Sequence, residues 1–223
     1  MSAILFDFNG TMIFDSPIVE NTWIKFLSKY GISATIEQVH TFALGVPSVD
    51  SVDHFFPNVS RVRNAELVDE MEQTYMDSCA ECAGGLYKLA DGLQDFLDEC
   101  KAKNIKMTIA TSAPQKNVEF FFDTLDLNRW FDYKDVVFCD GSYPGKPNPM
   151  IYLKAAAKLS SPIDDCVIFE DSTSGIIAAT RCNCKAVIGL TSSLNEKDIY
   201  NLGADYTIKD YKDKNRLLQI IEN

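Results

Sequence analysis

The amino-acid sequence predicts an α/β fold in which a parallel sheet carries an inserted helical domain. Short apolar runs alternate with helix-like stretches along most of the chain, which is typical of a parallel sheet with helices on both faces. One internal segment, residues 15–83, breaks this alternation because it shows helical patterns and no convincing strand. An open parallel sheet binds its ligands at the carboxyl ends of its strands, so a functional site is expected there.

The expected strands are short runs of apolar residues. The first covers residues 3–8 and is followed at once by Gly10, as in a buried strand that ends in a tight loop. Similar runs predict further strands at residues 105–110, 136–139, 166–169, 186–190 and, in a less apolar form, 206–208. Helix-like stretches separate them at residues 86–103, 116–125, 149–159 and 174–181.

The insert is expected to be entirely helical. It begins at Asp15-Ser16-Pro17, a capping side chain followed by proline at the first helical position. Apolar residues then recur at helical spacing up to Gly31, and two later segments look helical as well, 36–44 and 65–82. A glycine-containing linker at residues 83–85 leads back to the sheet. The predicted core domain is therefore residues 1–14 with 84–223, and the predicted insert is residues 15–83.

Composition and charge exclude several classes of protein. Of the 223 residues, 46% are hydrophobic and 24% are charged, which is ordinary for a globular protein with a sizeable core. The net charge is −11 and no basic stripe is present, so no nucleic-acid partner is expected. The apolar runs are too short to span a bilayer, so no membrane partner is expected either. No signal peptide is visible, and a cytoplasmic location is the default expectation.

The cysteines are expected to be reduced, buried thiols. Their number, seven, is odd and they are scattered along the chain. Two pairs are close in sequence, Cys79 with Cys82 and Cys182 with Cys184, but neither His is near them. The spacing between the pairs matches no zinc framework.

Four short polar segments follow the predicted strands. In chain order they are Asp7-Phe8-Asn9-Gly10-Thr11, Thr111-Ser112, Gly145-Lys146-Pro147 and Glu170-Asp171-Ser172. Because they belong to one edge of the sheet, we expect them to lie close together. Asp7 and Asp171 can share a hard cation through oxygen ligands, which suits Mg²⁺. Lys146 and the cation would offset the charge of a transferred phosphoryl group, and the hydroxyls of Thr111 and Ser112 would orient it.

These groups together predict phosphoryl transfer with Asp7 as the nucleophile. A carboxylate at a strand end, followed by a turn that contains Gly10, can present a nucleophilic oxygen beside backbone N–H groups. Covalent catalysis by a carboxylate is an established route for this reaction. The expected substrate is a small phosphorylated metabolite, and the sequence does not indicate an oligomeric state.

The ordered set of four segments resembles the haloacid dehalogenase superfamily. Within it the chain is similar to the β-phosphoglucomutase and phosphoglycolate phosphatase group, and the similarity extends over essentially the whole chain. The resemblance implies a Rossmann-like core with residues 15–83 as a helical cap. It also implies that Asp7 becomes phosphorylated and that Mg²⁺ is held by Asp7, by the backbone carbonyl of Asn9 and by Asp171. Glu170 usually contacts the metal through water in this family.

Asn9 departs from the pattern of the family. Phosphatases and mutases of the superfamily carry Asp at this position, as general acid for the leaving group and general base for water. A carboxamide does neither near neutral pH, and general acid–base catalysis is typically worth ~10²–10⁴ in rate. The backbone carbonyl is kept, so metal binding is expected to survive while activity is reduced.

Several alternatives follow from this departure. Phosphonoacetaldehyde hydrolases also lack the second Asp, but they need a cap lysine where this chain has Ser48. Haloacid dehalogenases lack the second Asp too, but they do not carry the Glu-Asp-Ser sequence seen at residues 170–172. Neither branch fits this chain well. The leading prediction is a phosphatase or phosphotransferase of reduced activity. The rivals are a phosphate-ester-binding or regulatory protein without turnover, and a natural Asp replaced by Asn9 to trap a complex. His40 and His54 of the insert are candidates to replace the missing proton shuttle, unless they are structural.

Overall fold

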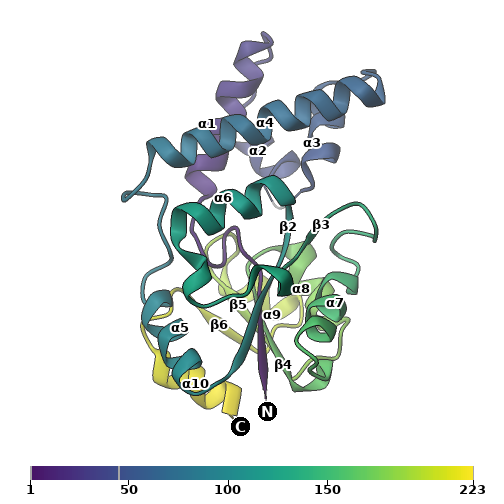
Figure 1. Ribbon diagram of the computed structural model, residues 1–223. Coiled ribbons are helices and arrows are strands. Elements are labelled where there is room, and N and C mark those ends of the chain that lie inside the picture. The colour runs from purple at the N-terminus through teal and green to yellow at the C-terminus, as the bar shows by residue number, and fades with distance from the viewer. Residues whose placement is uncertain (1, 45, 223) are drawn as a thin grey trace. The chain divides into compact units, whose positions relative to one another are not determined.

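The computed structural model describes residues 2–44 and 46–222. The chain divides into two compact units, one made of Met1–Phe14 with Leu89–Asn223 and the other of Asp15–Lys88. We call them the core unit and the helical unit, and Figure 1 shows the elements of each. The boundary expected from the sequence, between residues 83 and 84, lies a few residues before the one at Leu89.

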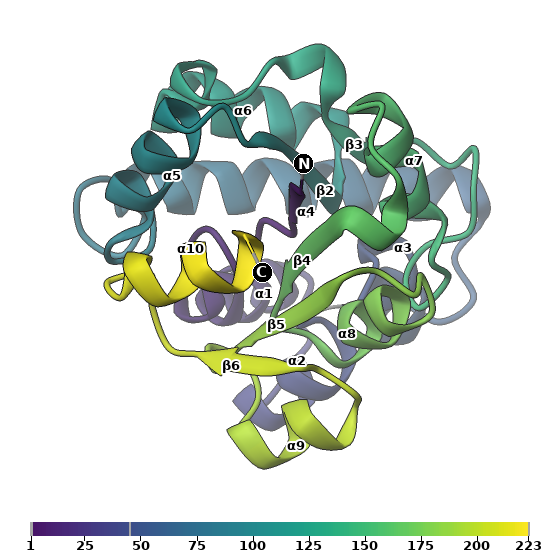
Figure 2. The ribbon, with the colours of Figure 1, turned by 90° about the horizontal axis from the view of Figure 1, so that it is seen from below.

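The core unit is built on a six-stranded parallel sheet with the order β3-β2-β1-β4-β5-β6 (Figures 1 and 2). Its strands are β1 (Ala3–Phe6), β2 (Lys106–Pro114), β3 (Val137–Cys139), β4 (Cys166–Glu170), β5 (Ala186–Leu190) and β6 (Tyr206–Ile208). The predicted α/β fold with a Rossmann-like parallel sheet is confirmed. The strand order reverses between β1 and β4, which is where an open α/β sheet forms its ligand site.

Helices cover both faces of the sheet. The core unit contains α5 (Leu93–Ala102), α6 (Gln115–Leu125), α7 (Met150–Lys158), α8 (Thr173–Thr180), α9 (Glu196–Asn201) and α10 (Lys214–Glu222). Three short 3₁₀ turns lie at Leu127–Arg129, Tyr133–Asp135 and Ile163–Asp165. Seen from below in Figure 2, α5 and α10 lie on one side of the strands while α8 and α9 lie on the other.

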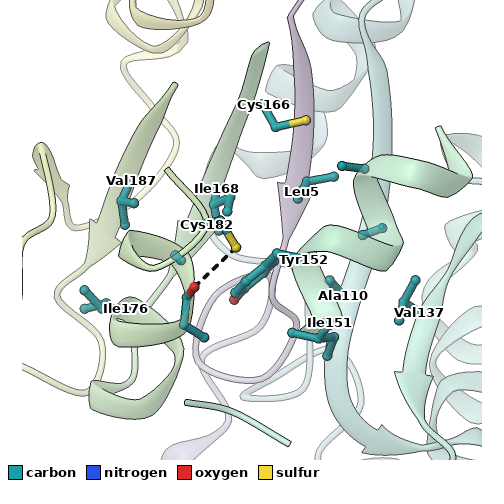
Figure 3. Close-up of a cluster of buried hydrophobic side chains, with 14 of the residues drawn as sticks. Leu5, Ala110, Val137, Ile151, Tyr152, Cys166, Ile168, Ile176, Cys182 and Val187 are labelled. Atoms are coloured by element: carbon teal, nitrogen blue, oxygen red, sulfur yellow. Dashed lines mark hydrogen bonds between the residues drawn. The ribbon is translucent and has the colours of Figure 1, made fainter. Parts of the chain in front are cut away.

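Alternate side chains of β1 enter the two layers of the core, as the period of two in a strand requires. Leu5 belongs to a buried cluster with residues of α7, α8 and α9, including Ile151 and Ile176 (Figure 3). Phe6 points to the opposite layer, where its ring stacks on Phe169 at 5.0 Å and contacts Phe96 of α5. Burial on both faces explains why β1 reads as a continuous apolar run.

The helical unit consists of α1 (Ser16–Lys29), α2 (Ile36–Phe42), α3 (Ser48–Phe55) and α4 (Arg61–Glu81) among the residues described. Its buried cluster combines aromatic and aliphatic side chains from these helices: Trp23, Phe26, Leu27, Val39, Ala43, Val52, Leu67 and Met71. The N-terminus of α2 is closed by a capping box between Thr35 and Gln38. Within the described chain, no helix has the length and apolarity that crossing a membrane requires.

Four helices differ from the sequence-based expectation. The helix expected from residue 86 begins at Leu93, because Gly92 has a left-handed φ of +80° that a helix does not continue through. The carboxylate of Asp15 does not cap α1 and instead accepts a hydrogen bond from the Tyr75 hydroxyl at 2.6 Å. Helix α4 starts earlier than expected, because the Ser60 side chain caps its first turn. Helix α3 was not predicted, because its segment is only eight residues long, although Val49, Val52 and Phe55 recur at a spacing compatible with a helix.

Candidate active site

The turn after β1 fixes the position of Asp7. The Asp7 amide donates to Phe169 O over 3.0 Å, so the ladder between β1 and β4 extends to this residue. The chain then turns sharply, and the amides of Thr11 and Met12 donate back to Phe8 O over 3.2 and 2.7 Å. The Asp7 side chain is therefore held at the carboxyl end of the central strand.

Two glycines let carboxylates approach the backbone closely. Gly10 has a φ of +74°, and a Cβ atom added there would lie 2.1 Å from Asp171 Oδ2. A Cβ atom added to Gly175 would lie 1.7 Å from Glu170 Oε1. Both contacts are far shorter than any carbon–oxygen contact allows, so a side chain at either position would displace a carboxylate.

Three buried carboxylates and one ammonium group form the centre of the site. Asp7, Glu170 and Asp171 are 6%, 0% and 4% exposed, and each offers a ligand atom within 4.8 Å of the others. Lys146 Nζ donates to Asp7 Oδ1 and to Glu170 Oε1, at 2.5 Å in each case. The structure thus brings together the acidic residues and the lysine that the sequence singled out in three separate segments of the chain.

The charges in this cluster do not balance when all groups are ionised. Burial and the neighbouring carboxylates of Glu170 and Asp7 raise the pKa of Asp171 well above its usual range. Burial alone would lower the pKa of Lys146, but the charges of Asp7 and Glu170 outweigh it and raise that pKa, so the lysine keeps its proton. The remaining excess of negative charge, built from oxygen ligands, fits a hard divalent cation.

Glu170 is held by five hydrogen bonds. Its Oε1 atom accepts from Lys146 Nζ and, over 3.1 Å, from the Tyr152 hydroxyl. Its Oε2 atom accepts from the amides of Asp171 and Ser172, both at 2.7 Å, and from the Ser172 hydroxyl. These bonds make Glu170 an anchor of the loop after β4. A water-mediated contact of Glu170 with a metal stays a prediction.

Two serines of the site were missed by the sequence reasoning. Thr11 Oγ1 donates to Asp171 Oδ1 over 3.1 Å, and the Ser193 hydroxyl donates to Asp171 Oδ2. The neighbouring Ser192 hydroxyl donates to Gly10 O over 2.5 Å. Both serines follow β5, so they form a fifth polar segment at a strand end. Their position directly after the apolar run 186–190 is the sequence signal that could have identified them.

The predicted pair Thr111 and Ser112 lies inside β2 rather than beyond its end, because this strand continues to Pro114. Thr111 is buried and stands two residues after Ile109, the register partner of Phe6, so it lies at the same edge of the sheet as Asp7. Its Oγ1 atom accepts from the Ala113 amide over 3.1 Å, which leaves its proton available for donation. The Ser112 residue is exposed.

The comparison with known families decides the identity of the protein. A model described as haloacid dehalogenase-like hydrolase matches residues 4–188, which is most of the chain. The chain belongs to this family. The resemblance inferred from the four segments is therefore confirmed, and the protein is an enzyme of the phosphatase group of haloacid dehalogenase-like hydrolases.

Individual relatives of this hydrolase cover nearly its whole length. It is 28% identical over 222 residues to the phosphorylated carbohydrates phosphatase of Thermotoga maritima, covering 99% of this chain and 100% of that protein. It is 27% identical to glycerol-1-phosphate phosphohydrolase 2 of Saccharomyces cerevisiae, covering 95% and 83% of the two chains. A crystal structure of a haloacid dehalogenase hydrolase, family IA, variant 3, from Entamoeba histolytica shares 30% identity and a TM-score of 0.90, with full coverage of both chains.

Position 9 of the haloacid dehalogenase-like site holds an asparagine, where the resemblance to the family predicts an aspartate. Asn9 is half-buried in the turn after Asp7 and forms an isolated bridge with Ile13. Its side chain is a carboxamide, whose ability to transfer protons near neutral pH is negligible. The two histidines proposed as substitutes have partners inside the helical unit. His40 Nε2 lies 2.6 Å from Glu20 Oε1, and His54 stacks on Phe42 at 3.6 Å.

The donor set of this hydrolase fits a metal ion. Among the residues described, Asp7, Glu170 and Asp171 form the one cluster of acidic, His or Cys groups whose ligand atoms are close enough to share an ion. All are hard oxygen donors, which suits Mg²⁺, the ion that enzymes of this family generally use. Neither cysteine pair joins such a cluster. The expectation that the cysteines are buried holds for four of them, but Cys82 and Cys184 are half-buried and Cys139 is exposed.

Proposed function

We propose that this enzyme is a Mg²⁺-dependent phosphatase that acts on a small phosphorylated carbohydrate through an aspartyl phosphate at Asp7. The observation that carries the proposal is the position of Asp7, which contacts Lys146 and lies beside two further buried carboxylates at the carboxyl end of the sheet. The neighbouring ammonium group favours the ionised form of this carboxylate, which is the nucleophilic form.

The residues divide the work as follows. A carboxylate oxygen of Asp7 attacks phosphorus, the bond to the leaving oxygen breaks, and the phosphoryl group becomes an acyl phosphate on Asp7. Lys146 donates to the equatorial oxygens as charge develops, and the Thr111 hydroxyl and Gly10 turn orient the group. Asp7, Asp171 and the backbone carbonyl of Asn9 would hold Mg²⁺, which supplies charge stabilisation when bound. Water then attacks the phosphorus atom, the bond from phosphorus to the Asp7 oxygen breaks, and phosphate leaves as the carboxylate is restored. The proton released by water and the proton taken up by the leaving oxygen are exchanged with solvent.

Asn9 determines the expected turnover rate and the expected preference among leaving groups. No carboxyl group at this position protonates the leaving oxygen or deprotonates water, so both half-reactions lose general acid–base catalysis. A leaving group of low pKa needs no proton, so activated esters should react best. Because attack of water also lacks a base, the phosphoenzyme should be long-lived.

The substrate class rests on the named relatives. The Thermotoga maritima relative is called a phosphatase of phosphorylated carbohydrates, and the yeast relative a glycerol-1-phosphate phosphohydrolase. Both match nearly the whole chain, so the proposal extends their common substrate chemistry, a phosphorylated polyol or sugar, to this enzyme.

The test is phosphate release from p-nitrophenyl phosphate and from a panel of sugar and polyol phosphates, with and without Mg²⁺. We expect turnover that requires Mg²⁺ and is lost in Asp7→Asn. Turnover that survives this substitution, or that is unaffected by chelation of divalent ions, would rule the proposal out.

One observation favours a second candidate function. Asn9 leaves the nucleophile, lysine and acidic cluster in place while removing the proton shuttle, which is what a phosphate-ester-binding regulatory protein would need. That candidate predicts Mg²⁺-dependent affinity for a phosphate ester without hydrolysis across the whole panel. Measurable turnover of any sugar phosphate would exclude it.

A further inference from the structure

Tyr152 is a buried polar residue for which the proposed reaction has no role. It lies in α7, is fully buried, and belongs to the apolar cluster beneath the sheet, where Figure 3 shows its ring among aliphatic side chains. A phenylalanine would fill the same space without a hydroxyl group. A buried hydroxyl is costly unless it forms a hydrogen bond, so the partner of this hydroxyl is informative.

The Tyr152 side chain contacts both members of the central ion pair. Its hydroxyl donates to Glu170 Oε1 over 3.1 Å. The ammonium of Lys146 lies over its ring, 5.2 Å from the centroid, within the range of a cation–π interaction. The same Glu170 oxygen accepts from Lys146, so the ammonium group, the carboxylate oxygen and the tyrosine each contact the other two.

This contact leads directly to the nucleophile. Lys146 Nζ donates to Asp7 Oδ1 as well as to Glu170 Oε1. An ammonium group between two carboxylates can shift toward either one, because both attract it. The ring and hydroxyl of Tyr152, on the Glu170 side, fix the position of the ammonium group. They therefore also fix the distance and direction of its hydrogen bond to Asp7.

We propose that Tyr152 is a positioning residue of this site, which fixes the Lys146–Glu170 pair through its hydroxyl and ring and so sets the contact between Lys146 and Asp7. The inference rests on the proposed function for its catalytic consequence, but its structural part concerns the free protein alone. A tyrosine that only filled the core would contribute to stability and leave the lysine unaffected.

The experiment compares Tyr152→Phe, which removes only the hydroxyl, with Tyr152→Leu, which also removes the ring. Tyr75→Phe is the matched control, because the Tyr75 hydroxyl is also buried and donates to a carboxylate, that of Asp15, in the helical unit. The first readout is the ammonium signal of Lys146 in ¹⁵N-lysine NMR spectra of the metal-free protein, assigned by its absence in Lys146→Arg.

We expect exchange of the Lys146 ammonium protons with water to accelerate about tenfold in Tyr152→Phe, the factor expected for loss of one hydrogen bond to a charged group. The signal should shift further in Tyr152→Leu, because the ring no longer lies against the ammonium. Tyr75→Phe should lose a similar amount of stability and leave the Lys146 signal unchanged. A Lys146 signal that is identical in wild type and Tyr152→Phe overturns the inference.

The second readout is the kinetics with p-nitrophenyl phosphate. Tyr152→Phe should lower kcat about tenfold and leave KM nearly unchanged, because Tyr152 orients Lys146 and does not contact substrate. If wild type turns over and Tyr152→Phe has the same kcat, the positioning role is wrong while the proposed function stands. If the Lys146 signal responds as expected and no variant, wild type included, releases phosphate, the proposed function is wrong while the structural coupling stands.

Discussion

Gly10 and Asp171 fit together so closely that a Cβ atom on Gly10 would come 2.1 Å from Asp171 Oδ2. Gly10 belongs to the turn that follows the proposed nucleophile, and Asp171 follows β4, the strand next to β1. The contact therefore couples the turn that holds Asp7 to the carboxylate expected to bind the metal. It also means that the conformation of the turn and the position of the metal ligand change together.

Gly10→Ala is expected to abolish metal-dependent activity and to lower the free energy of unfolding by about 3 kcal/mol, the sum of a left-handed φ and a steric clash. Gly31→Ala is the matched control, since Gly31 has a φ of +71° with no atom within 4 Å of its added Cβ. The control should lose only about 1 kcal/mol. Urea unfolding and Mn²⁺ binding followed by EPR measure both effects. Equal losses in the two variants, with Mn²⁺ affinity intact, would contradict the steric account.

Asn9→Asp is expected to raise kcat by ~10²–10⁴, because it restores a group that transfers protons to the leaving oxygen and from water. The gain should be larger for an alkyl phosphate such as glycerol 1-phosphate than for p-nitrophenyl phosphate, whose leaving group needs no proton. Steady-state kinetics on both substrates measure the two gains. Equal gains would show that Asn9 limits the step common to both substrates, hydrolysis of the phosphoenzyme, rather than departure of the leaving group. The absence of any gain would remove Asn9 as the cause of slow turnover.

Lys146→Met is expected to lower the free energy of unfolding by roughly 3 kcal/mol or more, because it leaves two buried carboxylates without their cation. Saturating Mg²⁺ should restore part of this loss by binding the folded state. Lys212→Met is the control, since Lys212 pairs with Asp91 in an exposed bridge at 2.8 Å and should have little effect. Thermal unfolding with and without Mg²⁺ distinguishes the two variants. A loss in Lys146→Met no larger than in the control would argue against a buried ion pair.

The free energy of unfolding should fall as the pH rises above about 9, because two buried cysteines keep their thiol protons in the folded protein. Burial raises the pKa of Cys79 and of Cys100 from 9.0 to about 12. Between these pH values the unfolded chain releases thiol protons that the folded protein keeps, so alkaline pH favours unfolding. Cys100→Ala should flatten this decline, and Cys139→Ser should not, because Cys139 is exposed. Chemical unfolding between pH 8 and 11 measures the slopes, and a steeper decline in Cys100→Ala would be inconsistent with the burial of this thiol.

Much of the site could be predicted from the sequence because its residues follow apolar runs. Asp7 and Glu170 stand at the ends of strands that are buried on both faces. The change from apolar to polar residues in the sequence therefore shows where each strand leaves the core. Lys146 stands out through its setting between Gly145 and Pro147. The parallel order of the elements then places these segments at one edge, and the structure brings Asp7, Lys146 and Glu170 into contact.

What could not be predicted depends on distances across the fold. Tyr152 reads as a core residue at helical spacing, and its contact with Glu170 exists only because α7 packs against β1 and β2, next to the end of β4. Ser193 is a common turn residue whose contact with Asp171 depends on the path of the chain after β5. The helix start at Leu93 depends on Gly92, whose left-handed conformation places it against the backbone of Lys212. None of these pairings leaves a periodic pattern in the sequence.

The central claim, that Asp7 becomes phosphorylated, is tested most directly by trapping the phosphoenzyme. The protein is incubated with Mg²⁺ and p-nitrophenyl phosphate, quenched in acid, and examined by intact mass spectrometry followed by peptide mapping. We predict one added phosphoryl group that maps to Asp7, accumulates because Asn9 slows its hydrolysis, and is absent in Asp7→Asn. A phosphoryl group on another residue, or one that persists in Asp7→Asn, would contradict the account.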